Sequence, residues 1–341
     1  MPVASLAAGF LPVLLLLAGL RALDSYKLVH RRMLFASLLA GAIACGLAWL
    51  AYRLMLDLAH ADHMLLDRVQ VPLLEEALKA AFVAWLIRAG QVGFLVDAAI
   101  CGFAVGTGFG LVENVYYWTL HDLSLWVWLA RGLGTAVMHG GTTAMFAILA
   151  QSTSERTGAT GSRELLPGYV LAAAVHALFN LLADHVLIEA AVIIATLPPL
   201  IKLVFEHSER ATRDWLGTNL DSEVAALEQI KGGEVAGTRI GDYLESLRQR
   251  FPDAVVADML CLLRVHLELS LRAKGILMAR SVGLDLPPDE SVRANLEELR
   301  FLERSIGATG QLALLPLRQR SRRDLWQIMV LSRRVESRKG A

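Results

Sequence analysis

Seven long apolar runs occupy most of the first 206 residues of the chain. As helices rising about 1.5 Å per residue, such runs can cross the roughly 30 Å hydrocarbon core of a bilayer. With 55% hydrophobic residues and a mean hydropathy of +0.47, the chain is too apolar for an ordinary soluble protein. The sequence therefore predicts an all-α polytopic membrane bundle of about seven spans. The predicted spans are residues 4–23, 33–56, 69–88, 93–119, 124–150, 166–185 and 186–206.

Basic residues predict how the chain is oriented in the membrane. The loop after the first span carries Arg21, Lys27, Arg31 and Arg32, and the positive-inside rule places such a loop in the cytoplasm. The N-terminus is then outside, and alternation of the spans leaves the C-terminus inside. A basic C-terminal tail fits that side, where anionic lipid headgroups attract it. The tail contains Arg318, Arg320, Arg322, Arg323, Arg333, Arg334 and Arg338.

The composition changes near residue 207 and becomes charged and amphipathic. Two domains are therefore predicted: a membrane domain of residues 1–206 and a cytoplasmic helical domain of residues 207–341, which would bind a partner that the sequence does not identify. A formal net charge of zero argues against nucleic acid as that partner, because the chain has no excess of basic residues to neutralise phosphate groups. Helices are expected in this second domain at 209–230, 239–250, 253–280, 289–306 and 321–335.

Ionisable and amide side chains inside the predicted spans are the most informative feature. Each charged group costs at least about 2.5–3.5 kcal/mol to insert, so such a residue usually marks a function or has a compensating partner. They are Glu75, Glu76 and Lys79 in the third span, Glu113 and Asn114 in the fourth, Arg131 and His139 in the fifth, and His176 and Asn180 in the sixth.

Helical spacing relates several of these residues. Glu75 and Lys79 are four residues apart and could pair, whereas Glu76 points about 100° away from Glu75. The doublet then offers either one carboxylate for a structural pair and one for chemistry, or two carboxylates that face different neighbours. His176 and Asn180 are also four apart and share a helix face.

Depth in the membrane gives a second relation among these side chains. Counting from the predicted span ends places four of them in a common layer in the outer half of the bilayer, with His139 deeper. Glycines at 102, 106 and 110 predict that the fourth helix approaches its neighbours closely. The four residues of the outer layer are Glu76, Glu113, His176 and Asn180.

Structural roles compete with a catalytic one at each position. A carboxylate paired with Lys79 can be a neutral buried pair, His176 with Asn180 can hydrogen-bond between helices, and Arg131 can be the counterion of Glu113. These readings do not explain why so many such groups converge.

A wet polar pocket in the membrane can support hydrolysis. A glutamate can take a proton from water while histidine and asparagine donate hydrogen bonds to the developing oxyanion. Two imidazoles and a carboxylate are also a donor set for catalytic zinc, with His139 and His176 as the candidate metal ligands. The sequence does not choose between zinc and metal-free catalysis.

At these residues the chain resembles the PrsW family of intramembrane proteases, which is distantly related to the CAAX-prenyl endopeptidases. EEALK at 75–79 is similar to the motif EExxK, and FGLVEN at 109–114 is similar to FxxxEN. RGLGTAVMH at 131–139 is similar to the family's Arg and His eight residues apart, and HALFN at 176–180 is similar to HxxxN/D. The resemblance covers about residues 10–205 and does not include the C-terminal domain.

The resemblance implies hydrolysis of a peptide bond in or just outside the bilayer, as in site-one cleavage of a single-span anti-sigma factor. By analogy with the CAAX relatives, a glutamate of the doublet would activate water, and His176 and Asn180 would stabilise the oxyanion. The family is often described as metalloproteases, yet the doublet can also work without metal. The catalytic candidates are Glu75, Glu76, Glu113, His139, His176 and Asn180, with Lys79, Asn114 and Arg131 in support.

Two other functions use the same features differently. A proton-coupled transporter would use the glutamates and histidines as a relay, although the sequence shows no inverted repeat of the kind many transporters have. A non-catalytic scaffold would depend on residues 207–341 instead, so truncation at residue 207 would abolish its function.

Overall fold

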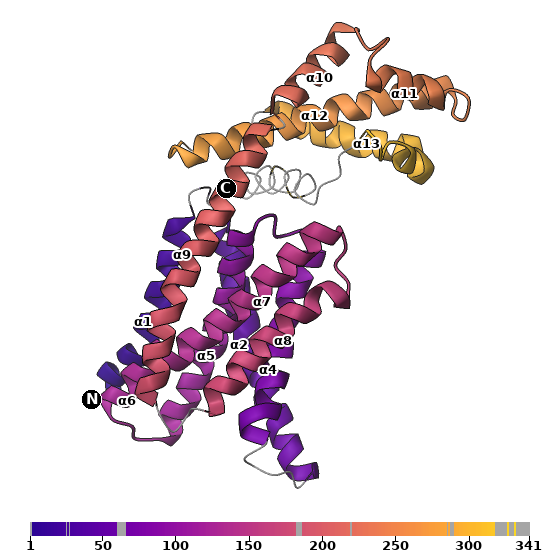
Figure 1. The fold of residues 1–341 in the computed structure, drawn as a ribbon. Helices are drawn as coiled ribbons and strands as arrows, with labels where there is room; N and C mark the ends of the chain where they lie inside the picture. Colours follow the sequence, from indigo (N-terminus) through magenta and orange to yellow (C-terminus); the bar gives the residue numbers. More distant parts are fainter. Residues whose placement is uncertain are drawn as a thin grey trace. The chain divides into compact units, whose positions relative to one another are not determined.

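The computed structural model describes residues 2–24, 26, 28–59, 66–181, 186–218, 220–284, 286, 290–317, 326 and 331. All regular structure within these residues is helical, as the sequence predicted (Figure 1). The chain divides into two compact units, Met1–Glu209 and Arg210–Ala341. Lys27, the Asp184-His185 loop, all the tail arginines from Arg318 onwards and nearly all of the predicted helix 321–335 lie outside the described residues.

The first unit is a bundle of long helices (Figure 1). Five segments among its described residues are long and apolar enough to cross a membrane: 4–23, 31–56, 95–120, 125–157 and 162–181. The seven-span count stays a prediction. The elements are α1 (Pro2–Leu23), α2 (Arg31–Ala59), η1 (Leu66–Gln70), α4 (Val71–Arg88), α5 (Leu95–Leu120), α6 (Leu125–Ala130), η2 (Arg131–Thr135), α7 (Ala136–Thr157), α8 (Ser162–Leu181) and α9 (Val186–Thr218).

Helix α5 is the centre of this bundle, because every residue from Val96 to Gly110 is buried. A helix that is apolar and buried all round must be enclosed by other helices. It packs against α7 on one side and α2 on another. The glycines of α5 permit this: a Cβ on Gly106 would lie 1.9 Å from the carbonyl oxygen of His139 on α7, and one on Gly108 would lie 2.0 Å from that of Leu38 on α2.

The fifth predicted span consists of three elements in series. Ser124 caps α6, a turn of π-helix (η2) follows, and α7 continues to Thr157, where Gly158 ends it with a positive φ of 70°. Turns of π-helix inside α-helices are rare and occur frequently at functional sites. Here the turn begins at Arg131.

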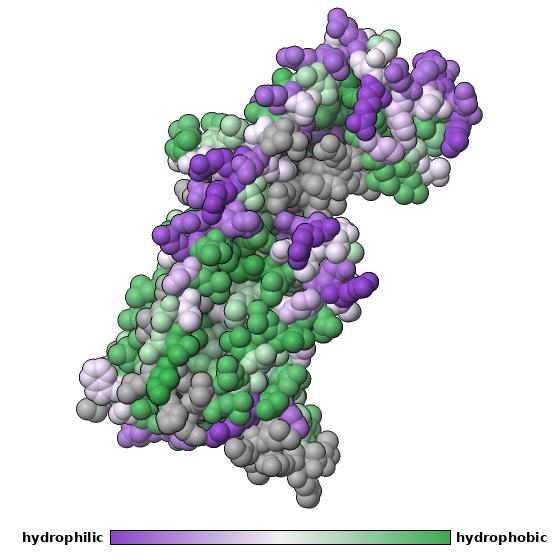
Figure 2. Space-filling view, in the orientation of Figure 1, coloured by the Kyte–Doolittle hydropathy of each residue, from purple (hydrophilic) through white to green (hydrophobic). Residues whose placement is uncertain are grey.

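The surface of the first unit suits a lipid environment. Figure 2 shows a mainly green, apolar face over these helices. Exposed large side chains on α2 include Phe35, Leu39, Ile43 and Leu47. By contrast, two charged residues of α4 are buried beneath this surface: Glu76 is 1% exposed and Lys79 is 0% exposed.

The second unit is a smaller helical domain with its own apolar core. Helices α12 and α13 pack together around Met259, Leu262 and Leu299, which are nearly fully buried. Lys274, also buried, donates a hydrogen bond to Glu223 on α10 at 2.8 Å. Its helices are α10 (Leu220–Gly232), α11 (Arg239–Leu247), α12 (Asp253–Ser281) and α13 (Glu290–Ala313).

One predicted boundary in this region is wrong. No helix ends near residue 207, because α9 continues unbroken to Thr218. The helical backbone predicted to end at residue 306 is interrupted there, since Gly307 has a φ of 66° and a ψ of −179°; a second helical segment, included in α13, follows to Ala313.

Candidate active site

Helix α4 points a polar face into the bundle. Its first turn contains Pro72, a residue suited to that position because it has no N–H to satisfy. Its buried residues include Glu76, Lys79 and Val83, spaced three and four apart on one helix face. The carboxylate and ammonium of α4 are therefore buried by protein and do not face lipid.

Glu76 is the hub of the polar cluster. Its Oε1 atom accepts hydrogen bonds from the Lys79 ammonium, from the Thr142 hydroxyl at 3.0 Å and from Nδ1 of His176 at 2.8 Å. Of the pairs that helical spacing allowed, Lys79 forms the one with Glu76, three residues away, and not the one with Glu75. Since an ionised carboxylate only accepts, Nδ1 of His176 carries the proton, and Nε2 of a neutral ring is unprotonated.

His139 is held from both sides of its ring. Nζ of Lys79 lies 3.1 Å from Nδ1, and Oε2 of Glu113 lies 2.9 Å from Nε2. An ammonium can only donate, so Nδ1 accepts and Nε2 carries the proton that is donated to Glu113. Lys79 on α4 and Glu113 on α5 therefore fix this imidazole in one tautomer and one orientation.

Arg131 and Asn114 form the next layer. Nε of Arg131 donates to Oδ1 of Asn114 at 3.1 Å, and Nδ2 of Asn114 donates to the carbonyl oxygen of Gly9 on α1 at 3.1 Å. The Arg131 guanidinium also lies 3.9 Å from the ring centre of Tyr117 and 3.7 Å from Glu113. The ion pair expected between Arg131 and Glu113 is therefore present.

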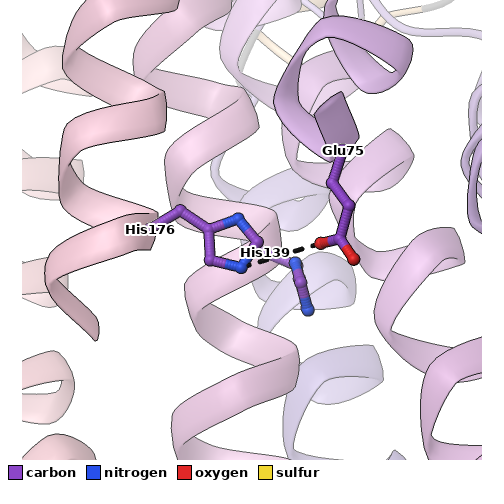
Figure 3. A group of neighbouring side chains, drawn as sticks. All are labelled: Glu75, His139 and His176. Atoms are coloured by element: carbon purple, nitrogen blue, oxygen red, sulfur yellow. Dashed lines mark ion pairs between the residues drawn. The ribbon is translucent and has the colours of Figure 1, made fainter. Parts of the chain in front are cut away.

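Glu75 differs from the other two glutamates. Its side chain is 16% exposed, and within the described part of the chain it makes no direct hydrogen bond; Nε2 of His176 lies 3.7 Å from its Oε2. Figure 3 shows Glu75, His139 and His176 pointing toward one another from three different helices. One ligand atom from each lies within 4.8 Å of the others.

Comparison with known families identifies the family to which the chain belongs. The model of the PrsW family intramembrane metalloproteases matches residues 29–204. The chain belongs to the PrsW family. No match was found among curated proteins or among solved structures. All the clustered PrsW side chains described above lie within the matched residues.

The PrsW family name implies a metal ion. Glu75, His139 and His176 carry the types of ligand atom that such an ion requires. Two imidazoles and a carboxylate match a catalytic zinc site, and the Glu76–His176 hydrogen bond is the outer-shell contact that orients a zinc-binding histidine. The fit is less complete at His139, because both its ring nitrogens already have partners. A metal bound there would displace either Lys79 or Glu113 from the ring.

The remaining site residues of this PrsW protein were predicted to different extents. Asn180 lies one turn beyond His176 on α8 and is partly exposed. Thr142 was missed, although it bridges Glu76 and the carbonyl oxygen of His139. Its position three residues after His139, on the same face of the helix, was the available signal.

Proposed function

We propose that this protein hydrolyses a peptide bond of a single-span membrane protein, such as an anti-sigma factor, with Glu75 as the base that activates water. One observation supports the assignment above others. Glu75 is the carboxylate beside the imidazoles that has no direct hydrogen bond in the described chain and is partly open. Glu76 has three donors on one oxygen and is buried, so its role is to hold the site together.

The hydrogen bonds suggest how the proton moves. Glu75 takes a proton from water as the water oxygen attacks the carbonyl carbon. The unprotonated Nε2 of His176, 3.7 Å from Glu75, then accepts this proton and delivers it to the amine of the leaving peptide. The products are one new carboxyl group and one new amine. Asn180 keeps its proposed role as a hydrogen-bond donor to the oxyanion.

Lys79 and Glu76 act on this reaction indirectly. The buried Lys79 ammonium touches both Glu76 and His139, so it fixes the two groups that orient the imidazoles. If a zinc ion is bound, the residues that would hold it are Glu75, His139 and His176. Such an ion would supply Lewis-acid polarisation of the water and the carbonyl.

The location of the reaction belongs to the same proposal. The basic loop after α1 supports an external N-terminus, which puts the polar cluster in the outer half of the bilayer. Residues from 210 onwards would then form a cytoplasmic domain, to which we assign a regulatory or partner-binding role.

Two isosteric variants test the proposal. Purified protein and a single-span reporter are combined in proteoliposomes, and cleavage is followed by gel and mass spectrometry. Glu75→Gln is expected to lower the cleavage rate about 10²- to 10⁴-fold without changing the thermal unfolding temperature. Glu76→Gln leaves Lys79 without its counterion and is expected to lower the stability by about 3–5 kcal/mol.

Glu206→Gln on α9 is the matched control, since that residue is about half exposed and pairs with Lys202 outside the cluster. It should cleave at the wild-type rate. If Glu75→Gln cleaves the reporter at the rate of the control variant, Glu75 is not the base that activates water.

A further inference from the structure

Arg131 is held rigidly at the edge of the cluster but has an unused donor. Its Nε bonds to Asn114, its guanidinium stacks on Tyr117, and its side chain is 14% exposed. Its Nη2 atom, however, is buried and has no hydrogen-bond partner among the described residues. Burying a charged donor without a partner is costly, and such an atom in a native structure calls for an explanation.

An acceptor lies beside this donor. Oε1 of Glu113 is 3.7 Å from Nη2 of Arg131, too far for a hydrogen bond. Oε2 of the same carboxylate is already bound to His139, so Oε1 is the oxygen that remains open to a ligand. The side chain of Glu113 is 24% exposed, so a ligand can approach this carboxylate. A donor and an acceptor thus lie side by side, each with a hydrogen bond that it could still make to a third group.

This arrangement matches the main chain of an extended peptide. In a hydrogen-bonded pair of antiparallel strands, one residue presents its N–H and its C=O to the same neighbour. The Glu113 carboxylate can accept that N–H, and the Arg131 guanidinium can donate to that C=O. We propose that Arg131 and Glu113 bind the backbone of one substrate residue, which must be unwound from helix into extended conformation.

The distances place this residue close to the reaction. Glu113 is joined to His139 by a 2.9 Å hydrogen bond, and His139 lies in the group whose ligand atoms are within 4.8 Å of Glu75. We call Arg131 and Glu113 together the clamp. A substrate residue bound by the clamp is therefore near the peptide bond that water attacks. The inference rests on the proposed function and adds a mode of substrate recognition by main chain, independent of the substrate's side chains.

A purely structural explanation makes different predictions. If Arg131 is only the counterion of Glu113, removing it weakens the fold or the site for all substrates equally. If it binds substrate, its removal matters most where the substrate presents the C=O that it binds.

Backbone ester substitution tests the clamp directly. Single-span reporters are made with one amide at a time replaced by an ester, around but not at the scissile bond, and kcat/KM is measured in micelles. We expect two adjacent sensitive positions. In the first sensitive reporter, the ester removes the N–H bound by Glu113 and should reduce kcat/KM about 10- to 100-fold. In the second, with the ester at the following position, the C=O bound by Arg131 is a weaker acceptor, and kcat/KM should fall about 3- to 10-fold.

The second position must depend on Arg131. In Arg131→Gln the ester at that position should have almost no further effect, while the first ester should still reduce kcat/KM. Arg88→Gln is the control, because Arg88 donates to the carbonyl oxygen of Thr160 away from the cluster, and it should keep the wild-type profile. If Arg131→Gln does not fold, Arg131→Lys keeps the charge, loses the planar fork and should lose the same sensitivity.

Two results would overturn the clamp. One is that no ester position lowers kcat/KM with the wild-type enzyme; the other is that the Arg131 variants show the same dependence of kcat/KM on ester position as the wild type. Failure of the proposed function looks different, because the wild-type enzyme would then not cleave even the all-amide reporter.

Discussion

Replacing Gly106 by alanine should disable the enzyme by displacing the backbone of His139. Gly106 lies at the closest approach of α5 to α7, where an added Cβ would be 1.9 Å from the carbonyl oxygen of His139 and 2.6 Å from the backbone nitrogen of Gly140. Both neighbours are backbone atoms, so no side chain can rotate away. The helices themselves must separate.

The size of the effect follows from these distances. Ordinary contact begins at 3.4 Å, so the backbone at His139 must move by about 1.5 Å, from 1.9 to 3.4 Å. The imidazole bonds of 2.9 and 3.1 Å to Glu113 and Lys79 cannot survive such a shift unchanged. A misplacement of about 1 Å can cost about 10²-fold in rate. Overpacking adds about 1–3 kcal/mol of destabilisation, larger than the roughly 1 kcal/mol gained from the helix propensity of alanine.

The assay compares two identical substitutions. Gly46→Ala on α2 is the control, because nothing lies within 4 Å of its added Cβ. Cleavage rate and thermal unfolding in detergent are measured for both variants. Gly106→Ala is expected to lose about 10²-fold in rate and to unfold at lower temperature, whereas Gly46→Ala should keep the parent's rate and unfold at the same or a slightly higher temperature. Equal behaviour of the two variants would refute the reasoning from helix contact.

Three further predictions concern charge and metal. Lys79→Met leaves Glu76 buried without its ammonium partner and should destabilise the protein by about 3–5 kcal/mol in thermal unfolding. An unchanged unfolding temperature would show that the Lys79–Glu76 pair does not stabilise the cluster. Glu75→Gln should weaken zinc binding by about 10-fold or more in calorimetric titration if zinc binds at the candidate donor set, and equal affinity would exclude this carboxylate as a ligand. Burial alone would raise the pKa of Glu268, but hydrogen bonds from Lys231 and Asn295 lower it below the usual 4.5. The stability it contributes is therefore present above about pH 4.5 and is lost as the pH falls through the lowered value, so Glu268→Gln should reduce the acid-induced rise in hydrogen exchange of α12. An unchanged rise would contradict that contribution.

The helices of the membrane unit were largely predictable, and their ends were less so. Apolar length locates α1 and α5 within two residues, because transfer to lipid depends on composition alone. Composition does not report where backbone hydrogen bonding stops. Helix α7 continues through the polar segment 151–157, past the predicted end at residue 150, until Gly158 ends it.

The residues of the polar cluster were predictable, because placing ionisable side chains in a membrane costs free energy and usually marks a function. Their hydrogen-bond partners were not predictable. Lys79 can reach a residue three or four positions earlier, and only the packing of α4 decides that Glu76 faces inward with it. His139 was expected to lie deeper than Glu113, because counting from the span end assumed one regular helix. The π-helical turn at Arg131–Thr135 interrupts that count. The spacing of Thr142 from His139 indicated a shared helix face, but its contact with Glu76 depends on how α7 is rotated.

The three donors on Glu76 come from α4, α7 and α8, which enter the bilayer in that order. A nascent chain that has inserted only as far as α7 has its candidate base but still lacks the second imidazole. If Glu75 is the base, cleavage is therefore expected only once α8 has joined the other helices of the bundle.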